Sequence, residues 1–228
     1  MISVDSARAA AAPQIDAVLF DLGGVLIELV GVERMLEWSP ELGTTDELWR
    51  KWLHSPAVRR YETGCGTRAE FADAIIVEFA LPVGRDDFLA EFAWWPRALF
   101  AGADELLASL ASRYTLASLS NTNELHWERF TREWSLPDRF HHNFPSYAVG
   151  KLKPDAGYFL HVLDALGLPP ERTLFVDDNA INVAAAADLG IVARRALGVG
   201  GVREVLAQLQ LVLPAPPAAI PATSAGIA

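Results

Sequence analysis

The sequence predicts an α/β protein with a doubly wound parallel sheet and a small helical cap inserted after the first strand. Two observations lead to this prediction. Short apolar runs alternate with segments of helical periodicity, which is typical of a parallel sheet covered by helices on both faces. One long region, from about residue 30 to 98, departs from this alternation and favours a helical insertion.

Five apolar runs are expected to form the strands of the sheet. The first lies within residues 15–21, IDAVLFD, because it is short, apolar and followed by glycines. Similar runs come later in the chain: YTLASLS (114–120), NFPSYAV (143–149), TLFVDD (173–178) and IVARRA (191–196).

Helices are expected between these strands, where apolar residues recur at spacings of three and four. The segments are ELHWERFTREW (124–134), DAGYFLHVLDALG (155–167), AINVAAAADLG (180–190) and VREVLAQLQ (202–210). Two of them close on a glycine, as helix C-termini often do. The stretch GVGG (198–201) lacks the GxGxxG spacing of a phosphate-binding turn, so we expect it to be a loop.

The region 30–98 has the composition of a separate helical unit. It holds five of the seven tryptophans and helical patterns such as RAEFADAIIVEFA, without a convincing strand. We therefore expect an α/β core formed by residues 15–29 and 99–212, with a helical cap at 30–98. Residues 1–14, rich in Ala, and residues 213–228, rich in Ala and Pro, are expected to be flexible ends.

Composition and charge exclude several classes of function. The formal net charge is −10 and the chain has no basic run, which argues against nucleic-acid binding. No stretch approaches the roughly 20 apolar residues that a membrane span needs. Cys65 is the only cysteine, so no disulfide can form within the chain. We expect a cytoplasmic monomer or homodimer that acts on a small molecule.

Polar residues capable of chemistry follow three of the predicted strands. The carboxyl ends of parallel strands face one crevice, so these residues are expected to converge. A lysine directly before a proline, in a loop leading to a helix, is a fourth element. Each has an ordinary structural explanation when taken alone, but their combination favours an active site. The residues are Asp21, Ser120, Asn121, Lys153, Asp177 and Asp178.

Four segments resemble the motifs of the haloacid dehalogenase-like (HAD) hydrolase superfamily, both in their order along the chain and in their residues. They are FDLGGVL, LSNTNELH, GKLKPDAGYF and FVDDNAINV. Members of the superfamily carry an aspartate nucleophile, a Ser/Thr, a Lys and a terminal acidic pair as four motifs. The resemblance covers nearly all of residues 15–200 and implies a Rossmann-like core, with 30–98 as the small helical cap. Within the superfamily, the segments look most like the branch of bacterial sugar-phosphate phosphatases, the glucose-1-phosphate phosphatase type among them.

The resemblance implies a nucleophile and a Mg²⁺ site. Asp21 would attack phosphorus and form an aspartyl phosphate, which divides hydrolysis into two easier displacements. Mg²⁺ prefers hard oxygen ligands, so Asp21, the backbone carbonyl of Gly23 and Asp178 are the expected direct ligands. Asp177 would support them, and Asn182 is expected to hold a metal-bound water.

The resemblance also implies the groups that bind the transferring phosphoryl oxygens. Ser120 would offer its hydroxyl, Asn121 its backbone amide and Lys153 its positive charge. Lys153 is also expected to separate the charge of Asp21 from that of the acidic pair.

Gly23 departs from the common pattern, in which the residue two after the nucleophile is a second aspartate that transfers protons. Losing a positioned acid or base typically costs ~10²–10⁴ in rate. The favoured interpretation is a Mg²⁺-dependent phosphatase whose small phosphorylated substrate, such as a sugar 1-phosphate, has a leaving group that needs little protonation. In a second, His126 or Glu62 supplies the proton. In a third, the protein is a catalytically impaired homologue that binds a phosphorylated ligand or a protein partner.

A 2-haloacid dehalogenase is the alternative enzyme within the superfamily. Such enzymes also lack the second aspartate, and they need no metal. The intact acidic pair Asp177–Asp178 favours a metal site and therefore the phosphatase.

Overall fold

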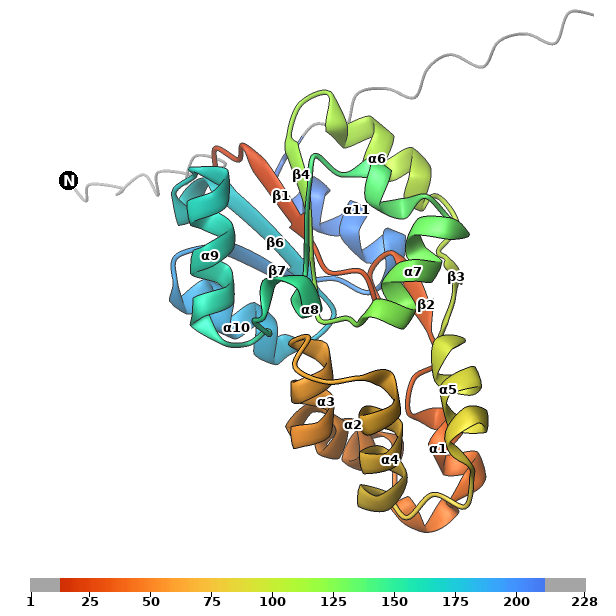
Figure 1. Cartoon of the computed structure of the whole chain (residues 1–228). Helices are drawn as coiled ribbons and strands as arrows, with labels where there is room; N and C mark the ends of the chain where they lie inside the picture. The colour runs from red at the N-terminus through yellow and green to blue at the C-terminus, as the bar shows by residue number, and fades with distance from the viewer. Residues whose placement is uncertain (1–12, 212–228) are drawn as a thin grey trace, which may run out of the picture.

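A computed structural model of the chain describes residues 13–211, and its centre is a five-stranded parallel sheet (Figure 1). The strand order is β5-β4-β1-β6-β7, which places the first strand in the middle. The strands are β1 (Ala17–Phe20), β4 (Thr115–Ser120), β5 (His142–Pro145), β6 (Thr173–Asp177) and β7 (Val192–Arg195). Since the chain moves outward from β1 in both directions, the predicted doubly wound α/β fold is confirmed.

The register of β1 brings the ends of three strands to the same level. Phe20, its last residue, lies opposite Ser118 of β4 and Val176 of β6. The residues that follow these positions therefore emerge together at the carboxyl edge of the sheet, as in other open parallel sheets.

Two apolar layers enclose the sheet, one on each face. On one face the strands pack against α6 (Ala103–Ala111), α7 (Glu124–Arg132) and α11 (Gly198–Gln208). On the other face they pack against α9 (Ala156–Leu166) and α10 (Ala180–Asp188). Burial of both faces explains why the strands read as continuous apolar runs.

The helical segment between β2 and β3 has a hydrophobic core of its own (Figure 1). Its helices are α1 (Glu33–Trp38), α2 (Thr45–His54), α3 (Pro56–Glu62), α4 (Arg68–Glu78) and α5 (Arg85–Ala93). Trp52 lies at the centre of this core, with its ring against Phe71, Phe92 and Trp95. A two-stranded antiparallel ribbon, β2 (Ile27–Leu29) and β3 (Pro96–Leu99), joins this segment to the sheet domain.

Some local features differ from the sequence-based expectations. No strand was expected within 30–98, yet β3 begins at Pro96, because a short edge strand with exposed residues lacks a clear apolar pattern. Residues 143–149 were expected to form one strand, but β5 ends at Pro145 and Ser146–Val149 form the short helix α8. The Ser146 hydroxyl bonds to both backbone groups of Thr122, which fixes this change of direction. Helix α6 was not anticipated.

The expectation of a loop at GVGG (198–201) was wrong, because these residues form the first turn of α11. Val199 and Val202 are buried three positions apart, so packing against the sheet outweighs the low helix propensity of the glycines. Short single-turn segments complete the connections: η1 (Pro40–Leu42), η2 (Leu136–Arg139) and η3 (Pro170–Arg172).

The flexibility predicted for 1–14 and 213–228 concerns residues outside the described range, apart from Pro13 and Gln14. Between residues 13 and 211, no helix combines the length and the apolar character required to cross a bilayer. Cytoplasmic localisation, the oligomeric state and the lack of a nucleic-acid partner stay predictions.

Candidate active site

The turn after β1 presents Asp21 at the carboxyl edge of the sheet. The Asp21 amide donates to the Val176 carbonyl at 2.9 Å, which continues the sheet, and its carboxylate oxygen Oδ1 accepts from the Leu22 amide at 2.7 Å. Gly24 has a φ of +69°, and a Cβ atom there would lie 2.5 Å from Asp178 Oδ2. The second glycine of the turn is therefore required by both its backbone conformation and the close approach of Asp178.

Gly24→Ala is expected to displace the Asp178 carboxylate and to strain the turn, because alanine disfavours this φ and lacks the space. We expect the affinity for Mg²⁺ to fall by about tenfold or more, as with other changes that disturb ligand orientation. Titration of the metal, followed by isothermal calorimetry, measures this change. Gly200→Ala is the matched control, because Gly200 has no atom within 4 Å of a Cβ and no positive φ. Equal metal affinity in both variants would contradict this role of Gly24.

Lys153 lies between the carboxylates of two strand ends. Its Nζ is 2.9 Å from Asp21 Oδ1 and 2.7 Å from Asp177 Oδ2, and the lysine is only 3% exposed. Oxygens of Asp21, Asp177 and Asp178 lie within 4.8 Å of one another. The structure thus brings together Asp21, Lys153 and the acidic pair, as the sequence predicted.

The two members of the acidic pair have different surroundings. Asp177 is fully buried and accepts hydrogen bonds from Lys153 Nζ, the Asn179 amide and Asn182 Nδ2. Asp178 is only partly buried and lies against Gly24. This contrast agrees with Asp178 as the direct ligand and Asp177 as its support. Asn182 Nδ2 donates to Asp177, and its expected role in holding a metal-bound water stays a prediction.

The charges of this cluster are out of balance without a further cation. Burial, together with the carboxylates of Asp177 and Asp178, raises the pKa of Asp21 to about 7 even though Lys153 opposes the shift. Burial and Asp177 raise the pKa of Asp178 to about 6. The pKa of Lys153 is also raised, since attraction to Asp177 and Asp21 outweighs the effect of burial.

The donor set fits Mg²⁺. Three carboxylates share one ammonium group, and hard oxygens are the ligands that Mg²⁺ prefers. Among the described residues, no hydrogen bond reaches the Gly23 carbonyl, which leaves it available as a further oxygen ligand. Asp21, Asp178 and this carbonyl would hold the ion.

Ser120 ends β4, and Asn121 directly follows it. The closest hydrogen-bond acceptor of the Ser120 hydroxyl is the Asn121 carbonyl at 3.4 Å, a long contact that leaves the hydroxyl able to donate to a ligand. The Asn121 side chain accepts from the Lys153 amide at 2.8 Å and donates to the Lys153 carbonyl at 2.9 Å. Sequence reasoning assigned a role only to the Asn121 backbone, so it missed this clamp on the lysine segment.

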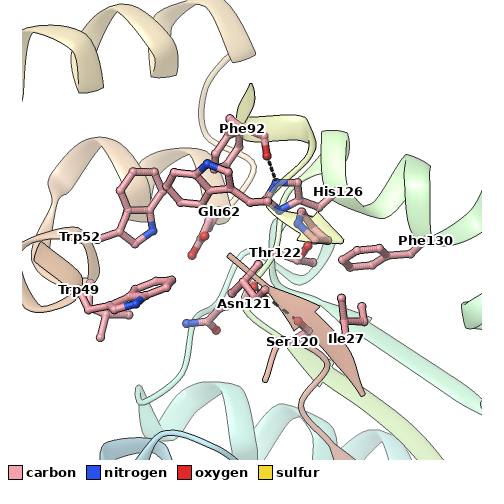
Figure 2. Close-up of a pocket in the computed structure, with 15 residues that line it drawn as sticks. Ile27, Trp49, Trp52, Glu62, Phe92, Ser120, Asn121, Thr122, His126 and Phe130 are labelled. Atoms are coloured by element: carbon pink, nitrogen blue, oxygen red, sulfur yellow. Dashed lines mark hydrogen bonds between the residues drawn. The ribbon is translucent and has the colours of Figure 1, made fainter. Parts of the chain in front are cut away.

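A pocket lies between the helical segment and the sheet domain, next to Ser120 and Asn121 (Figure 2). Trp49, Trp52 and Glu62 enter it from α2 and α3 on the cap side. Its volume is about 120 Å³. Sequence reasoning favoured core packing for most of the tryptophans and left open that Trp94 and Trp95 line a pocket; Trp95 does line it, whereas Trp94 is not among its lining residues.

Glu62, one of two suggested proton donors, ends α3 and lines this pocket (Figure 2). The Glu62 side chain is half-buried and surrounded by protein atoms on most sides. Burial is the main cause that raises the pKa of Glu62 to about 8; the Asp21 charge adds to the shift, while Lys153 and Arg59 oppose it. The group is therefore largely protonated at neutral pH and can donate a proton.

His126, the other suggested proton donor, is a buried packing residue. Its Nε2 lies 2.7 Å from the Phe92 carbonyl, to which it donates, and its Nδ1 accepts from Asn123 Nδ2 at 3.1 Å. Burial lowers the pKa of His126 to about 4. Both ring nitrogens are engaged and the ring is neutral, so the suggestion of His126 as a proton donor was wrong.

Contacts between the cap and the core hold the end of α3, where Glu62 lies, against the sheet domain. Arg59 lies on the same helix as Glu62 and forms an ion pair with Asp155 at 2.7 Å. Gly64, two residues after Glu62, has a φ of +72°, and a Cβ there would lie 2.3 Å from the Tyr147 carbonyl oxygen. The end of α3 is thus packed directly on the sheet domain.

A family model of haloacid dehalogenase-like hydrolases matches residues 15–190. The chain belongs to the HAD-like hydrolases. A HAD family enzyme from Bacteroides thetaiotaomicron, solved in complex with magnesium and inorganic phosphate, is 30% identical and superposes with a TM-score of 0.66, over 80% of this chain and 94% of that one. A predicted HAD-like hydrolase from Porphyromonas gingivalis is 26% identical with a TM-score of 0.70, over 87% and 99% of the two chains.

One curated relative of this HAD-like hydrolase matches over a shorter segment. It is drimenol cyclase drtB from Aspergillus calidoustus, which is 44% identical over 59 residues. These residues make up 26% of this chain and 11% of the cyclase. The match therefore concerns a small part of a much longer protein.

Proposed function

We propose that this HAD-like hydrolase is a Mg²⁺-dependent phosphatase that hydrolyses a small phosphate monoester through an aspartyl phosphate on Asp21. The observation that carries the proposal is the convergence of Asp21, Asp177, Asp178 and Lys153 at one edge of the sheet. The relative solved with magnesium and phosphate supports it.

The residues of the site divide the work of phosphoryl transfer. A bound Mg²⁺ would supply positive charge for the carboxylates and the phosphoryl oxygens. Asp21 forms a bond to phosphorus as the bond to the leaving oxygen breaks, while Ser120 and Lys153 hold the phosphoryl oxygens. Water then attacks phosphorus, which releases inorganic phosphate and restores the Asp21 carboxylate.

We assign the proton transfers to Glu62, in place of the acid that Gly23 lacks. Protonated Glu62 donates its proton to the leaving oxygen as the alcohol departs. The resulting carboxylate then takes a proton from the attacking water, so the group returns to its starting state. Its place in the pocket beside Ser120 and Asn121, together with its raised pKa, supports this assignment.

Glu62→Gln is expected to lower turnover of alkyl phosphates by ~10²–10⁴, the usual effect of losing a positioned acid. Turnover of p-nitrophenyl phosphate should change little, because its leaving group departs without a proton. Glu62 donates only when protonated, so wild-type kcat for alkyl esters should fall as pH rises through about 8. This decline should be absent in the variant.

Glu41→Gln, a change at an exposed glutamate of the cap, is the control and should leave both rates unaltered. Equal losses on both types of substrate in Glu62→Gln would argue against proton transfer by this residue.

Release of inorganic phosphate from a panel of phosphate esters tests the proposed function directly. We expect turnover with Mg²⁺ and at least ~10²-fold less after chelation with EDTA, because metal charge supplies several kcal/mol of stabilisation in such reactions. A dehalogenase would instead release halide from 2-haloacids without metal. A binding homologue would be stabilised by phosphate and Mg²⁺ while the whole panel remained intact. Either of these results would refute the phosphatase.

A further inference from the structure

The lining and the size of the pocket beside the catalytic cluster indicate what the alcohol part of the substrate is. We propose that this part is a compact, mainly hydrocarbon ring that carries one or two hydrogen-bond acceptors, and not a sugar. This inference rests on the proposed phosphatase function, because the pocket opens next to the groups that would hold the phosphate.

Most of the surface around this pocket is apolar and comes from both parts of the molecule (Figure 2). Trp49, Trp52 and Phe92 line it on the cap side, while Ile27 and Phe130 line it on the core side. No lysine or arginine is among its lining residues within the described range. Such walls favour a ligand group that gains free energy by leaving water.

The polar groups of the pocket are too few for a sugar. His126 uses both ring nitrogens within the protein, and the Asn121 side chain is engaged by the Lys153 backbone. Ser120 and Glu62 are assigned to the phosphoryl group and the leaving oxygen. A pyranose would therefore bury several hydroxyls without partners, which is unfavourable.

Two residues that line the pocket carry buried donors without an acceptor. The indole Nε1 of Trp95 and the hydroxyl of Thr122 are buried, and neither has a hydrogen-bond partner. Trp95 and Thr122 are each 2% exposed, so bulk water does not serve them. A ring or ether oxygen, or a carbonyl, on the ligand would satisfy these donors. This is why the proposed ring carries an acceptor.

The size of this pocket suits about one ring. Its volume is about 120 Å³, and apolar cavities of roughly 150 Å³ accept benzene. A six-membered ring attached through a methylene to the phosphate matches this space.

Three phosphate esters of equal shape test the proposal. They are glucose 6-phosphate, tetrahydropyran-2-ylmethyl phosphate, which keeps the ring oxygen and lacks the hydroxyls, and cyclohexylmethyl phosphate, which lacks both. All three release a primary alcohol from a six-membered ring. We expect kcat/KM with Mg²⁺ to be highest for the tetrahydropyranyl ester and at least ~10-fold lower for glucose 6-phosphate.

A variant pair locates the effect in this pocket. Leu53, which lines it and is 37% exposed, can be changed to Gln without loss of a buried core residue. Leu53→Gln should raise KM for the tetrahydropyranyl ester several-fold and leave kcat/KM for methyl phosphate, which has no ring to place in the pocket, unaffected. Leu160→Gln, at an exposed leucine of α9 outside the pocket lining, should change neither.

The possible failures are distinguishable. If glucose 6-phosphate is hydrolysed as well as the tetrahydropyranyl ester or better, the inference is overturned and the phosphatase stands. If none of the esters is hydrolysed, p-nitrophenyl phosphate included, the proposed function is overturned together with the inference.

Discussion

Asp21→Asn is expected to abolish phosphatase turnover, with kcat lowered on the order of 10⁴ or more, because an amide cannot form the bond to phosphorus. Rapid acid quench after mixing with a ³²P-labelled ester should recover label on the wild-type protein and none on the variant. Retained turnover in Asp21→Asn would refute the assignment of the nucleophile.

The same variant should remain folded, and the pKa of Asp21 gives the sign of its stability change. Burial and nearby carboxylates raise this pKa from 3.8 to about 7, so the folded state binds the proton more tightly than the unfolded state. Stability from the protonated group is therefore lost as pH rises through about 7. An uncharged asparagine avoids that loss, so the metal-free variant at pH 8 should melt no lower than wild type.

Lys153→Met is expected to have the largest effect on stability. Lys153 is the buried ammonium between Asp21 and Asp177, and removal of one partner from a buried ion pair costs roughly 3–5 kcal/mol. Turnover should be lost as well, because the phosphoryl oxygens lose a cation. Urea unfolding at pH 8 measures the change in the free energy of unfolding.

The pH dependence of that loss distinguishes charge from packing. In the variant, the charge of Lys153 no longer lowers the pKa of Asp21. Protonation of Asp21 at lower pH should therefore relieve its repulsion from the neighbouring carboxylates. The stability deficit of Lys153→Met should therefore shrink between pH 8 and pH 5. Lys151→Met, at the exposed neighbouring lysine, should stay within about 0.5 kcal/mol of wild type at both pH values. A deficit independent of pH would mean that lost packing dominates.

Much of the catalytic cluster could be predicted from the sequence because it depends on a simple topological rule. Asp21 and the acidic pair follow apolar runs that are buried on both faces, and the ends of such strands meet at one edge. Lys153 could be placed only through the resemblance to the family motifs, since its loop has no pattern that fixes its position.

The hydrogen bonds within the cluster required the structure. The resemblance already favoured Asp178 as the direct ligand and Asp177 as its support, and the structure adds that Asp177 is fully hydrogen-bonded and that the Asn121 side chain clamps the lysine segment. Glu62 and His126 were equivalent suggestions at the level of sequence. Their hydrogen bonds and surroundings separate them. Both ring nitrogens of His126 are hydrogen-bonded within the protein, whereas Glu62 lines the pocket and its pKa responds to the charges of Asp21 and Lys153.

By itself, the sequence determined the α/β class, the helical insertion and the residues that the strand ends present, since these depend on local periodicity and strand order. The tertiary structure alone decided which cap residues reach the site and how apolar the pocket is. Those features arise from contacts between segments far apart in the chain, such as Glu62 near Asn121 and the Phe92 carbonyl on His126. Hydrophobic packing sets these contacts, and it leaves no periodic pattern that a reader of the sequence could find.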